Sequence, residues 1–223
     1  MVGAAWLVAR KDLLIELRTR TAFISAVVFS ITGLAIFYFA WSPTAVGAMD
    51  LAPGVVWVVF AFSSILAVQR SFSIELPERA GDGLLISPID REAIYLGKAV
   101  ANVIFIYAVQ VIAIPAAALF YNLPFARSLG VLLVIAALST VGVVAVGTLF
   151  ASMAVNTRMA ELLLPLLSLP FYMPVVMAAG QATQRMLAGR PLSESMVWIK
   201  LLVAFDLVFF VACALAFPYT LEE

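Results

Sequence analysis

The side chain best placed to do chemistry in this sequence is an aspartate within an apolar run. Asp206 lies nine residues into the segment Val197–Phe217. An ionised carboxylate near mid-bilayer costs at least about 2.5–3.5 kcal/mol unless it is paired or hydrated. Lys200 precedes it by close to two helical turns, so the long lysine stem could reach partway. A proton relay would need a chain of such groups. The sequence therefore favours a structural or cavity-lining role for Asp206.

The sequence contains few other residues that could take part in catalysis. The chain has no histidine, which removes the commonest general base and metal ligand. Its one cysteine, Cys213, lies in an apolar run and is interpreted as a packed hydrophobic residue. Gly97-Lys98 resembles part of a phosphate-binding loop, but Glu92 and Ala99 stand where that motif needs a glycine and a Ser or Thr. If this protein uses ATP, another polypeptide hydrolyses it.

The amino-acid composition indicates which kind of secondary structure positions these residues. Hydrophobic residues make up 65% of the 223 residues and charged residues 12%, whereas about a quarter of a soluble protein is charged. The 13 basic and 13 acidic residues balance, which gives no indication of nucleic-acid binding. The sequence predicts an all-α integral membrane protein.

Six segments are long and apolar enough to cross about 30 Å of hydrocarbon. They are Thr21–Trp41, Leu51–Gln69, Ala99–Tyr121, residues 128–157, Leu162–Gly180 and Val197–Phe217. Asn102, Gln110 and Asn156 are expected to form hydrogen bonds between helices. Pro165, Pro170 and Pro174 should kink or interrupt the fifth span, a feature more typical of transport proteins than of anchors.

Lys and Arg counts in the loops give the orientation. With the N-terminus in the cytoplasm, nine basic residues lie inside and four outside. The inside set is Arg10, Lys11, Arg18, Arg20, Arg70, Arg79, Arg91, Lys98 and Arg158; the outside set is Arg127, Arg185, Arg190 and Lys200. Both termini are therefore expected in the cytoplasm.

Residues 1–20 are predicted to form a cytoplasmic interfacial helix, and residues 21–223 a six-helix transmembrane domain. Trp6, Leu13, Leu14 and Leu17 fall on one arc, interrupted by Arg10, with Lys11, Asp12, Glu16 and Arg18 opposite. Two interpretations remain open: an ordinary positive-inside anchor, or an amphipathic helix that also contacts a partner.

The segment 70–98 carries nine charged residues between two spans and is the longest polar stretch. Within it, Pro77 and Pro88 bracket residues 78–87, and Asp90 is placed to cap a helix that begins at Arg91. Leu84, Leu85 and Ile86 supply apolar surface that a merely solvated loop does not need. We interpret it as a short cytoplasmic element that docks on another protein. Its candidate contacts are Arg70, Glu75, Glu78, Arg79, Asp82, Leu84, Leu85, Ile86, Pro88 and Arg91.

Several stretches resemble the heme exporter B family of cytochrome c maturation, the membrane permeases of an ABC-type complex. They are residues 51–58 (LAPGVVWV), 62–67 (FSSILA), 70–72 (RSF), 84–91 (LLISPIDR), 96–98 (LGK) and, more weakly, 162–170 (LLLPLLSLP). The resemblance covers nearly the whole chain and is densest over residues 51–98. Gly81-Asp82 departs from the Leu-Glu more usual in the family.

The resemblance implies an ABC-2-like permease of the bacterial inner membrane, with a cytoplasmic coupling helix between its second and third spans. Segment 70–98 would couple to a separate ABC ATPase subunit, which binds the ATP. A second copy of the chain, heme-handling membrane proteins and a periplasmic heme chaperone would complete the assembly. Without histidine, the chain itself is not expected to hold heme firmly, although the complex handles it.

Three alternative functions make different demands on the sequence. An ABC-2-type permease for a lipid, glycan or drug would share the coupling segment, and only the resemblance over residues 51–72 argues against it. An intramembrane enzyme would need several convergent catalytic groups, and Asp206 has no evident base or metal cluster beside it. A passive scaffold would leave the coupling segment and the proline-rich fifth span without a purpose.

Overall fold

The computed structural model describes residues 2–42, 46–73, 90–124, 129–154 and 160–221. These residues form seven α-helices and one short 3₁₀ helix, and no strand occurs among them. The elements are α1 (Val2–Thr19), α2 (Thr21–Ala40), α3 (Ala48–Ser73), α5 (Arg91–Tyr121), α6 (Leu129–Ala154), α7 (Ala160–Leu187), α8 (Leu192–Ala216) and η2 (Phe217–Leu221).

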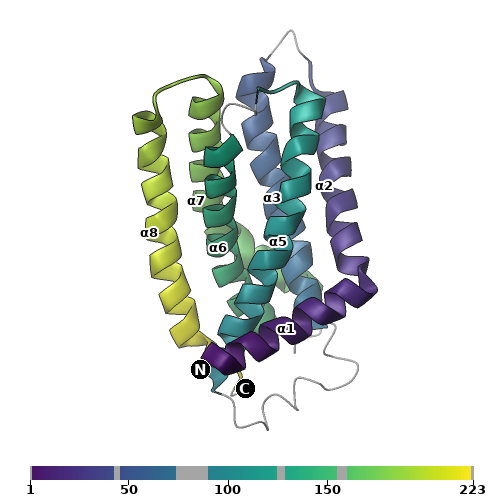
Figure 1. Cartoon of the computed structure of the whole chain (residues 1–223), viewed down its shortest axis with the longest axis vertical. Coiled ribbons are helices and arrows are strands. Elements are labelled where there is room, and N and C mark those ends of the chain that lie inside the picture. The colour runs from purple at the N-terminus through teal and green to yellow at the C-terminus, as the bar shows by residue number, and fades with distance from the viewer. Residues whose placement is uncertain (1, 43–45, 74–89, 125–128, 155–159, 222–223) are drawn as a thin grey trace.

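The six predicted spans are confirmed as helices. Helices α2, α3, α5, α6, α7 and α8 are each long and apolar enough to cross a membrane. They run up and down as one bundle, while α1 lies across one end of it (Figure 1). Both chain termini lie at that same end. Both termini lie at one end because the chain runs the length of the bundle an even number of times.

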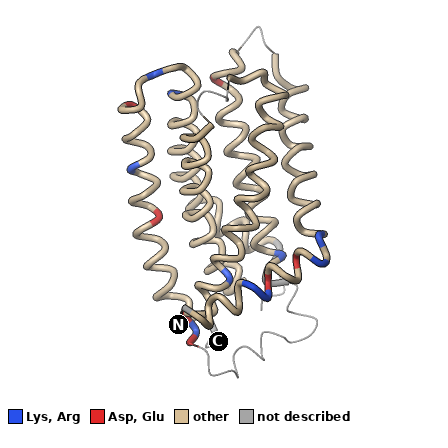
Figure 2. The backbone as a smooth tube through the Cα atoms, in the orientation of Figure 1, with Lys and Arg blue, Asp and Glu red and all other residues tan. Residues whose placement is uncertain are grey.

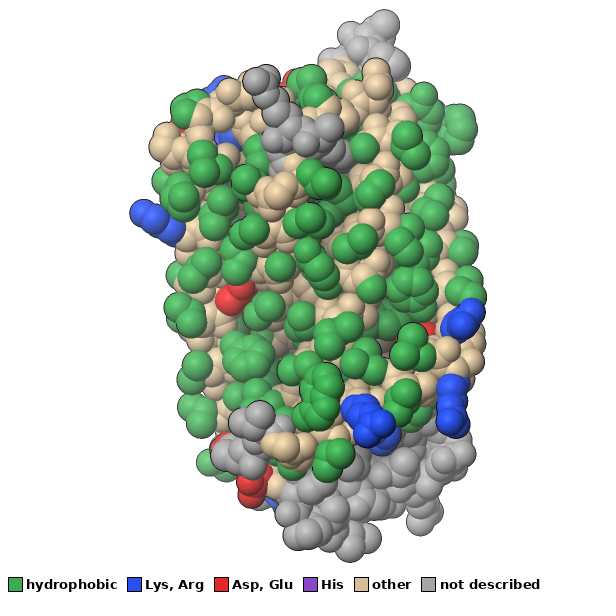
Figure 3. Space-filling model, viewed as in Figure 1, with side chains coloured by type: hydrophobic (Ala, Val, Ile, Leu, Met, Phe, Trp, Pro, Cys, Tyr) green, Lys and Arg blue, Asp and Glu red, His purple; other side chains and the backbone are tan. Residues whose placement is uncertain are grey.

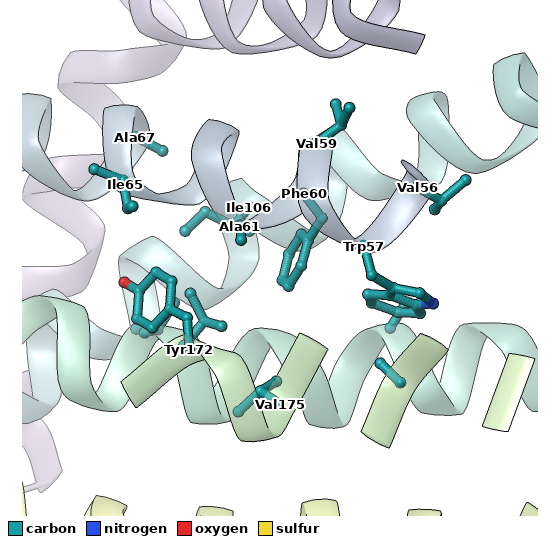
Figure 4. Close-up of a cluster of buried hydrophobic side chains, with 14 of the residues drawn as sticks. Val56, Trp57, Val59, Phe60, Ala61, Ile65, Ala67, Ile106, Tyr172 and Val175 are labelled. Carbon is teal, nitrogen blue, oxygen red and sulfur yellow. The ribbon is translucent and has the colours of Figure 1, made fainter. Parts of the chain in front are cut away.

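Helix α3 forms the centre of the bundle. In the most apolar 18-residue stretch of α3, 72% of the residues are buried, compared with 22% in the corresponding stretches of α2 and α8. Trp57 and Phe60 of α3 pack edge to face and point toward α7, where Tyr172 and Val175 lie (Figure 4). The Trp57 indole Nε1 donates to Thr183 Oγ1 at 2.9 Å. The family-like stretch at residues 51–67 is therefore the packed core of this fold.

The outward faces of the bundle are apolar, as a lipid-facing protein requires. Figure 3 shows hydrophobic side chains over most of the visible flank. Large exposed examples are Phe39 on α2, Leu119 on α5 and Leu207 on α8. In lipid such residues need no cover, so the helices associate through close packing and hydrogen bonds between helices.

The prolines of α7 do not break it. The helix is continuous from Ala160 to Leu187 with Pro165, Pro170 and Pro174 inside it. Of the two expected effects, interruption does not occur, and the kink stays a prediction. Transmembrane helices tolerate prolines where local adjustments and neighbouring groups satisfy the freed carbonyls. Pro170 and Pro174 also lie on the exposed face of the helix, where their rings displace no packed neighbour.

Candidate functional site at the charged end of the bundle

Charged residues gather at the end of the bundle that α1 crosses (Figure 2). Helix α3 ends and α5 begins there, so both ends of the predicted coupling segment meet α1. Of the ten candidate contacts, the structure describes Arg70 and Arg91. The others lie outside the described residues: Glu75, Glu78, Arg79, Asp82, Leu84, Leu85, Ile86 and Pro88.

Helix α5 starts where the sequence predicts. Asp90 occupies the N-cap position, and its backbone carbonyl accepts from Ala93 at 2.9 Å. The Asp90 side chain makes no capping hydrogen bond, however, so that part of the expectation is wrong. Arg91 donates to the carbonyl of Pro218 at 3.2 Å. The first turn of α5 is thereby tied to the C-terminal 3₁₀ helix.

Arg70 lies in the last turn of α3 beside a small cavity of about 40 Å³. Asp12 and Glu16 of α1 line the same cavity, together with Asn102 of α5. Three elements that are distant in sequence therefore bring charged or polar side chains together around this cavity. Arg70 and Arg91 lie on opposite sides of that segment in the chain and contact different neighbours.

Helices α1 and α5 approach each other unusually closely. A Cβ atom on Gly97 would lie 2.6 Å from the Ala5 carbonyl oxygen and 2.6 Å from Val8 Cβ. Ala5, Val8 and Ala9 are all buried. On α5, Ala93, Gly97 and Ala101 recur every four residues and are buried. Small residues at this spacing allow two helices to pack closely in a membrane. The spacing is visible in the sequence and could have indicated this contact.

A buried ion pair crosses this α1–α5 seam. Lys98 is 2% exposed, and its Nζ lies 3.5 Å from Asp12 Oδ2. Asp12 also meets Lys11 at 3.1 Å. The sequence places Lys98 among the basic residues expected on the cytoplasmic side, and nothing in its pattern indicates burial against α1. Removing one member of such a pair leaves a buried charge uncompensated.

Glu16 joins α1 to α2. Its Oε1 accepts the backbone N–H of Phe23 at 2.8 Å, which satisfies an amide in the first turn of α2. Arg20, between the two helices, adopts a left-handed conformation with φ 53° and donates its amide to the Glu16 carbonyl. The elbow between α1 and the first span is thus held by one carboxylate and one backbone bond.

Three residues of the predicted apolar arc of α1 face outward, whereas the fourth, Leu13, is partly buried and lines the cavity beside Arg70. Trp6, Leu14 and Leu17 are exposed, while the side that packs on the bundle carries Ala5, Val8 and Ala9. Asp12 and Glu16, expected on a solvated face, turn inward to Lys98 and Phe23. Helix α1 therefore has two apolar faces, one of small residues and one of large ones.

The three predicted intramembrane polar residues differ in their partners. Asn102 Nδ2 lies 3.5 Å from Thr148 Oγ1, a long hydrogen bond between α5 and α6. Gln110 borders a small gap with Ser30 and Ser63, and its Nε2 has no partner within the described part of the chain. Asp206 is buried, and neither of its oxygens has a partner there either. Asn156 lies outside the described residues.

The described residues at this end of the bundle hold helices together. Across the described ranges no three His, Cys, Asp or Glu side chains converge to hold a metal ion. The residues join the start of α5 to α1 through Gly97 and Lys98, and to η2 through Arg91. A force applied there would move α5 and α1 together, because their backbones touch at Gly97.

Within the described ranges, the fold defines a helical, multi-pass membrane protein. Residues 3–223 match the family model described as CcmB protein, and the chain belongs to this family. It is 31% identical over 180 residues to the heme exporter protein B of Pseudomonas aeruginosa, covering 81% of this chain and 80% of that one. It is also 28% identical over 175 residues to the protein of the same name from Rhodobacter capsulatus, covering 78% of this chain and 80% of that one.

Proposed function

We propose that this chain is the membrane permease subunit of an ABC-type complex that exports or delivers heme for cytochrome c maturation. Family membership, with relatives named heme exporter protein B, supports heme as the species the complex handles. The chain is a transporter component and not an enzyme by itself. ATP hydrolysis belongs to a separate ATPase subunit.

The observation that carries this proposal is the junction at the charged end. Helix α3 ends and α5 begins at the end of the bundle that α1 crosses, and Gly97, Lys98 and Arg91 hold the start of α5 against its neighbours. An ATPase docked on residues 70–98 would therefore move several elements as one body. The expected contacts in that segment remain those named from the sequence, with Leu84, Leu85 and Ile86 as its apolar centre.

We place this end in the cytoplasm, with both termini. The excess of Lys and Arg at this end supports that orientation. A second copy of the chain would complete the permease, because ABC ATPases act in pairs. Heme-handling membrane proteins and a periplasmic heme chaperone would receive or carry the heme.

The chain offers no evident protein ligand set for a firmly held heme of its own. It has no histidine, and Cys213 is buried in the span α8. We therefore assign it a mechanical role in which heme handling falls to its partners.

Deletion of the gene tests this function against the rival permease for a lipid, glycan or drug. Holo-cytochrome c should fall to the background level in the deletion strain, and the plasmid-borne chain should restore it. Periplasmic apo-cytochrome should still be synthesised, which separates a heme-delivery defect from loss of the polypeptide. Normal holo-cytochrome c in the deletion strain would contradict the proposal.

A further inference from the structure

Three buried polar side chains border one small gap inside the bundle, and each comes from a different helix. They are Ser30 of α2, Ser63 of α3 and Gln110 of α5, and none is more than 4% exposed. The remaining walls of the gap are apolar, with Leu34 and Val56 among them. All three polar residues lie well inside their spans, where neither bulk water nor lipid tails satisfy a polar group.

The two serines can only accept hydrogen bonds from the gap. Ser30 Oγ donates its hydrogen to the Ala26 carbonyl at 2.8 Å, and Ser63 Oγ donates its own to the Phe60 carbonyl at 2.9 Å. A hydroxyl has one hydrogen and two lone pairs, so an oxygen that donates in this way keeps its lone pairs as acceptors. The α2 and α3 sides of the gap therefore offer two acceptors.

Gln110 offers the opposite kind of group. Its side-chain Nε2 carries two hydrogens, is buried, and has no hydrogen-bond partner among the described residues. A buried donor without a partner pays its full desolvation cost. The gap thus brings one unpaired donor close to two acceptors, although no direct hydrogen bond joins Gln110 Nε2 to either serine.

We propose that one water molecule binds in this gap and joins α2, α3 and α5. It accepts a hydrogen bond from Gln110 Nε2, and it donates one hydrogen to Ser30 Oγ and the other to Ser63 Oγ. Three hydrogen bonds are typical of a buried water in a protein. The volume of the gap is about 10 Å³, and one water needs about 10–15 Å³, so the site holds a single molecule.

Other small ligands match these groups less well. A cation would face the hydrogens of the Gln110 amide, and an anion would face the lone pairs of both serines. An apolar molecule would leave Gln110 unpaired. Water is both donor and acceptor, and these three side chains need one acceptor and two donors.

The water gives α2 a second polar connection to the bundle. The Tyr121 hydroxyl of α5 already donates to the Leu34 carbonyl of α2 at 3.1 Å. Ser30 lies one turn away from Leu34, so the two connections are adjacent along α2. Neither heme nor the ATPase takes part in this site, which therefore does not depend on the proposed function.

A cryo-EM structure of the chain in lipid nanodiscs, at a resolution that shows ordered water, tests the site directly. We expect one density peak in the gap, about 2.7–3.2 Å from Gln110 Nε2 and from both serine oxygens. A gap without a peak would overturn the proposal, as would a direct hydrogen bond between Gln110 and a serine. This measurement uses the unaltered chain, so it does not depend on the folding of any variant.

Thermal unfolding gives a test in which the sign of the change decides. Gln110→Met keeps a similar size but removes the donor, and loss of the water bridge should lower the Tm by about 2–4 °C. The matched control is Ser139→Ala on α6, since the Ser139 hydroxyl is also buried without a partner in the described ranges but does not border this gap. Its Tm should stay or rise. An unchanged or higher Tm for Gln110→Met would show that its amide is unpaired and would overturn the proposal.

Double variants test whether the water connects the side chains. Ser30→Ala and Gln110→Met should each lower the Tm, and together they should lower it by less than the sum, because either change removes the shared water. Ser139→Ala combined with Gln110→Met is the reference pair and should be additive. Additive effects for Ser30→Ala and Gln110→Met would contradict a shared water.

Discussion

Gly97 of α5 touches the backbone of α1 at Ala5, so closely that any side chain at position 97 would meet the Ala5 carbonyl oxygen at 2.6 Å. A flexible side chain could move out of the way, but a backbone carbonyl inside a helix cannot. The separation of α1 and α5 is thus set by the absence of one carbon atom. This contact joins the N-terminal helix to the end of the coupling segment.

Gly97→Ala should destabilise the protein although alanine is the better helix former. Helix propensity alone would raise stability by about 1 kcal/mol. Overpacking against the Ala5 carbonyl and Val8 should cost about 1–3 kcal/mol and prevail. Thermal unfolding in detergent checks this. Gly130→Ala is the matched control, since its Cβ would meet nothing within 4 Å, and its Tm should stay or rise. An unchanged Tm for Gly97→Ala would contradict the close contact.

The Asp12–Lys98 pair should behave as a coupled unit. Asp12→Leu leaves a buried lysine without that carboxylate, and Lys98→Met leaves the carboxylate without Lys98. Each single change should lower stability, while the double change should cost less than the sum by about 0.5–3 kcal/mol. Unfolding midpoints of the four proteins give the coupling energy. Strictly additive effects would show that the two charges do not interact.

Topology can be checked with two introduced cysteines. Gly83→Cys and Gly47→Cys, each in a Cys213→Ala background, should react with a membrane-impermeant maleimide from opposite sides. Position 83 should label only after the cytoplasmic face is opened, and position 47 in intact spheroplasts. Labelling of both from one side would contradict the six-span arrangement.

Leu84→Asp/Leu85→Asp should detach the ATPase while leaving the permease in the membrane. Burying each leucine at an interface contributes on the order of 1.5–3 kcal/mol, so losing both should weaken association by several powers of ten. Pull-down of the ATPase and the yield of holo-cytochrome c measure this.

Leu192→Asp provides the control for that variant. Leu192 is exposed at the start of α8, at the far end of the bundle, and its replacement should leave ATPase capture unchanged. Wild-type capture by the Leu84/Leu85 variant would show that these residues are not the coupling contact.

The spans were predictable because twenty apolar residues have few alternatives in a chain of this composition. The start of α5 at Arg91 also follows from sequence, since Pro88 and Asp90 precede it and a long apolar stretch follows. The orientation of α1 was not predictable from its pattern. Trp6 and Leu17 define the larger apolar arc, yet Ala5 and Ala9 define the packed one. The hydrophobic pattern identifies both faces of α1. Only the position of Gly97 on α5 determines which of the two faces packs on the bundle.

The charged site was harder to anticipate. Lys98 reads as one more basic residue beside a membrane, and its partner Asp12 lies 86 residues earlier. Such long-range pairs leave no mark in local periodicity. The continuity of α7 through three prolines was missed for a related reason, because the tolerance of a membrane helix for proline depends on its neighbours and not on its own sequence.

The attachment of α1 to α5 also dictates an order of assembly. Helix α1 is made first, but the surface it packs on begins at Ala93, after both α2 and α3 have been synthesised. During synthesis the N-terminal helix must therefore wait at the membrane surface with its small-residue face uncovered. Its exposed Trp6, Leu14 and Leu17 are suited to holding it there. The face of large apolar residues would thus hold α1 at the membrane during synthesis. The face of small residues would pack against α5 only once α5 has been made.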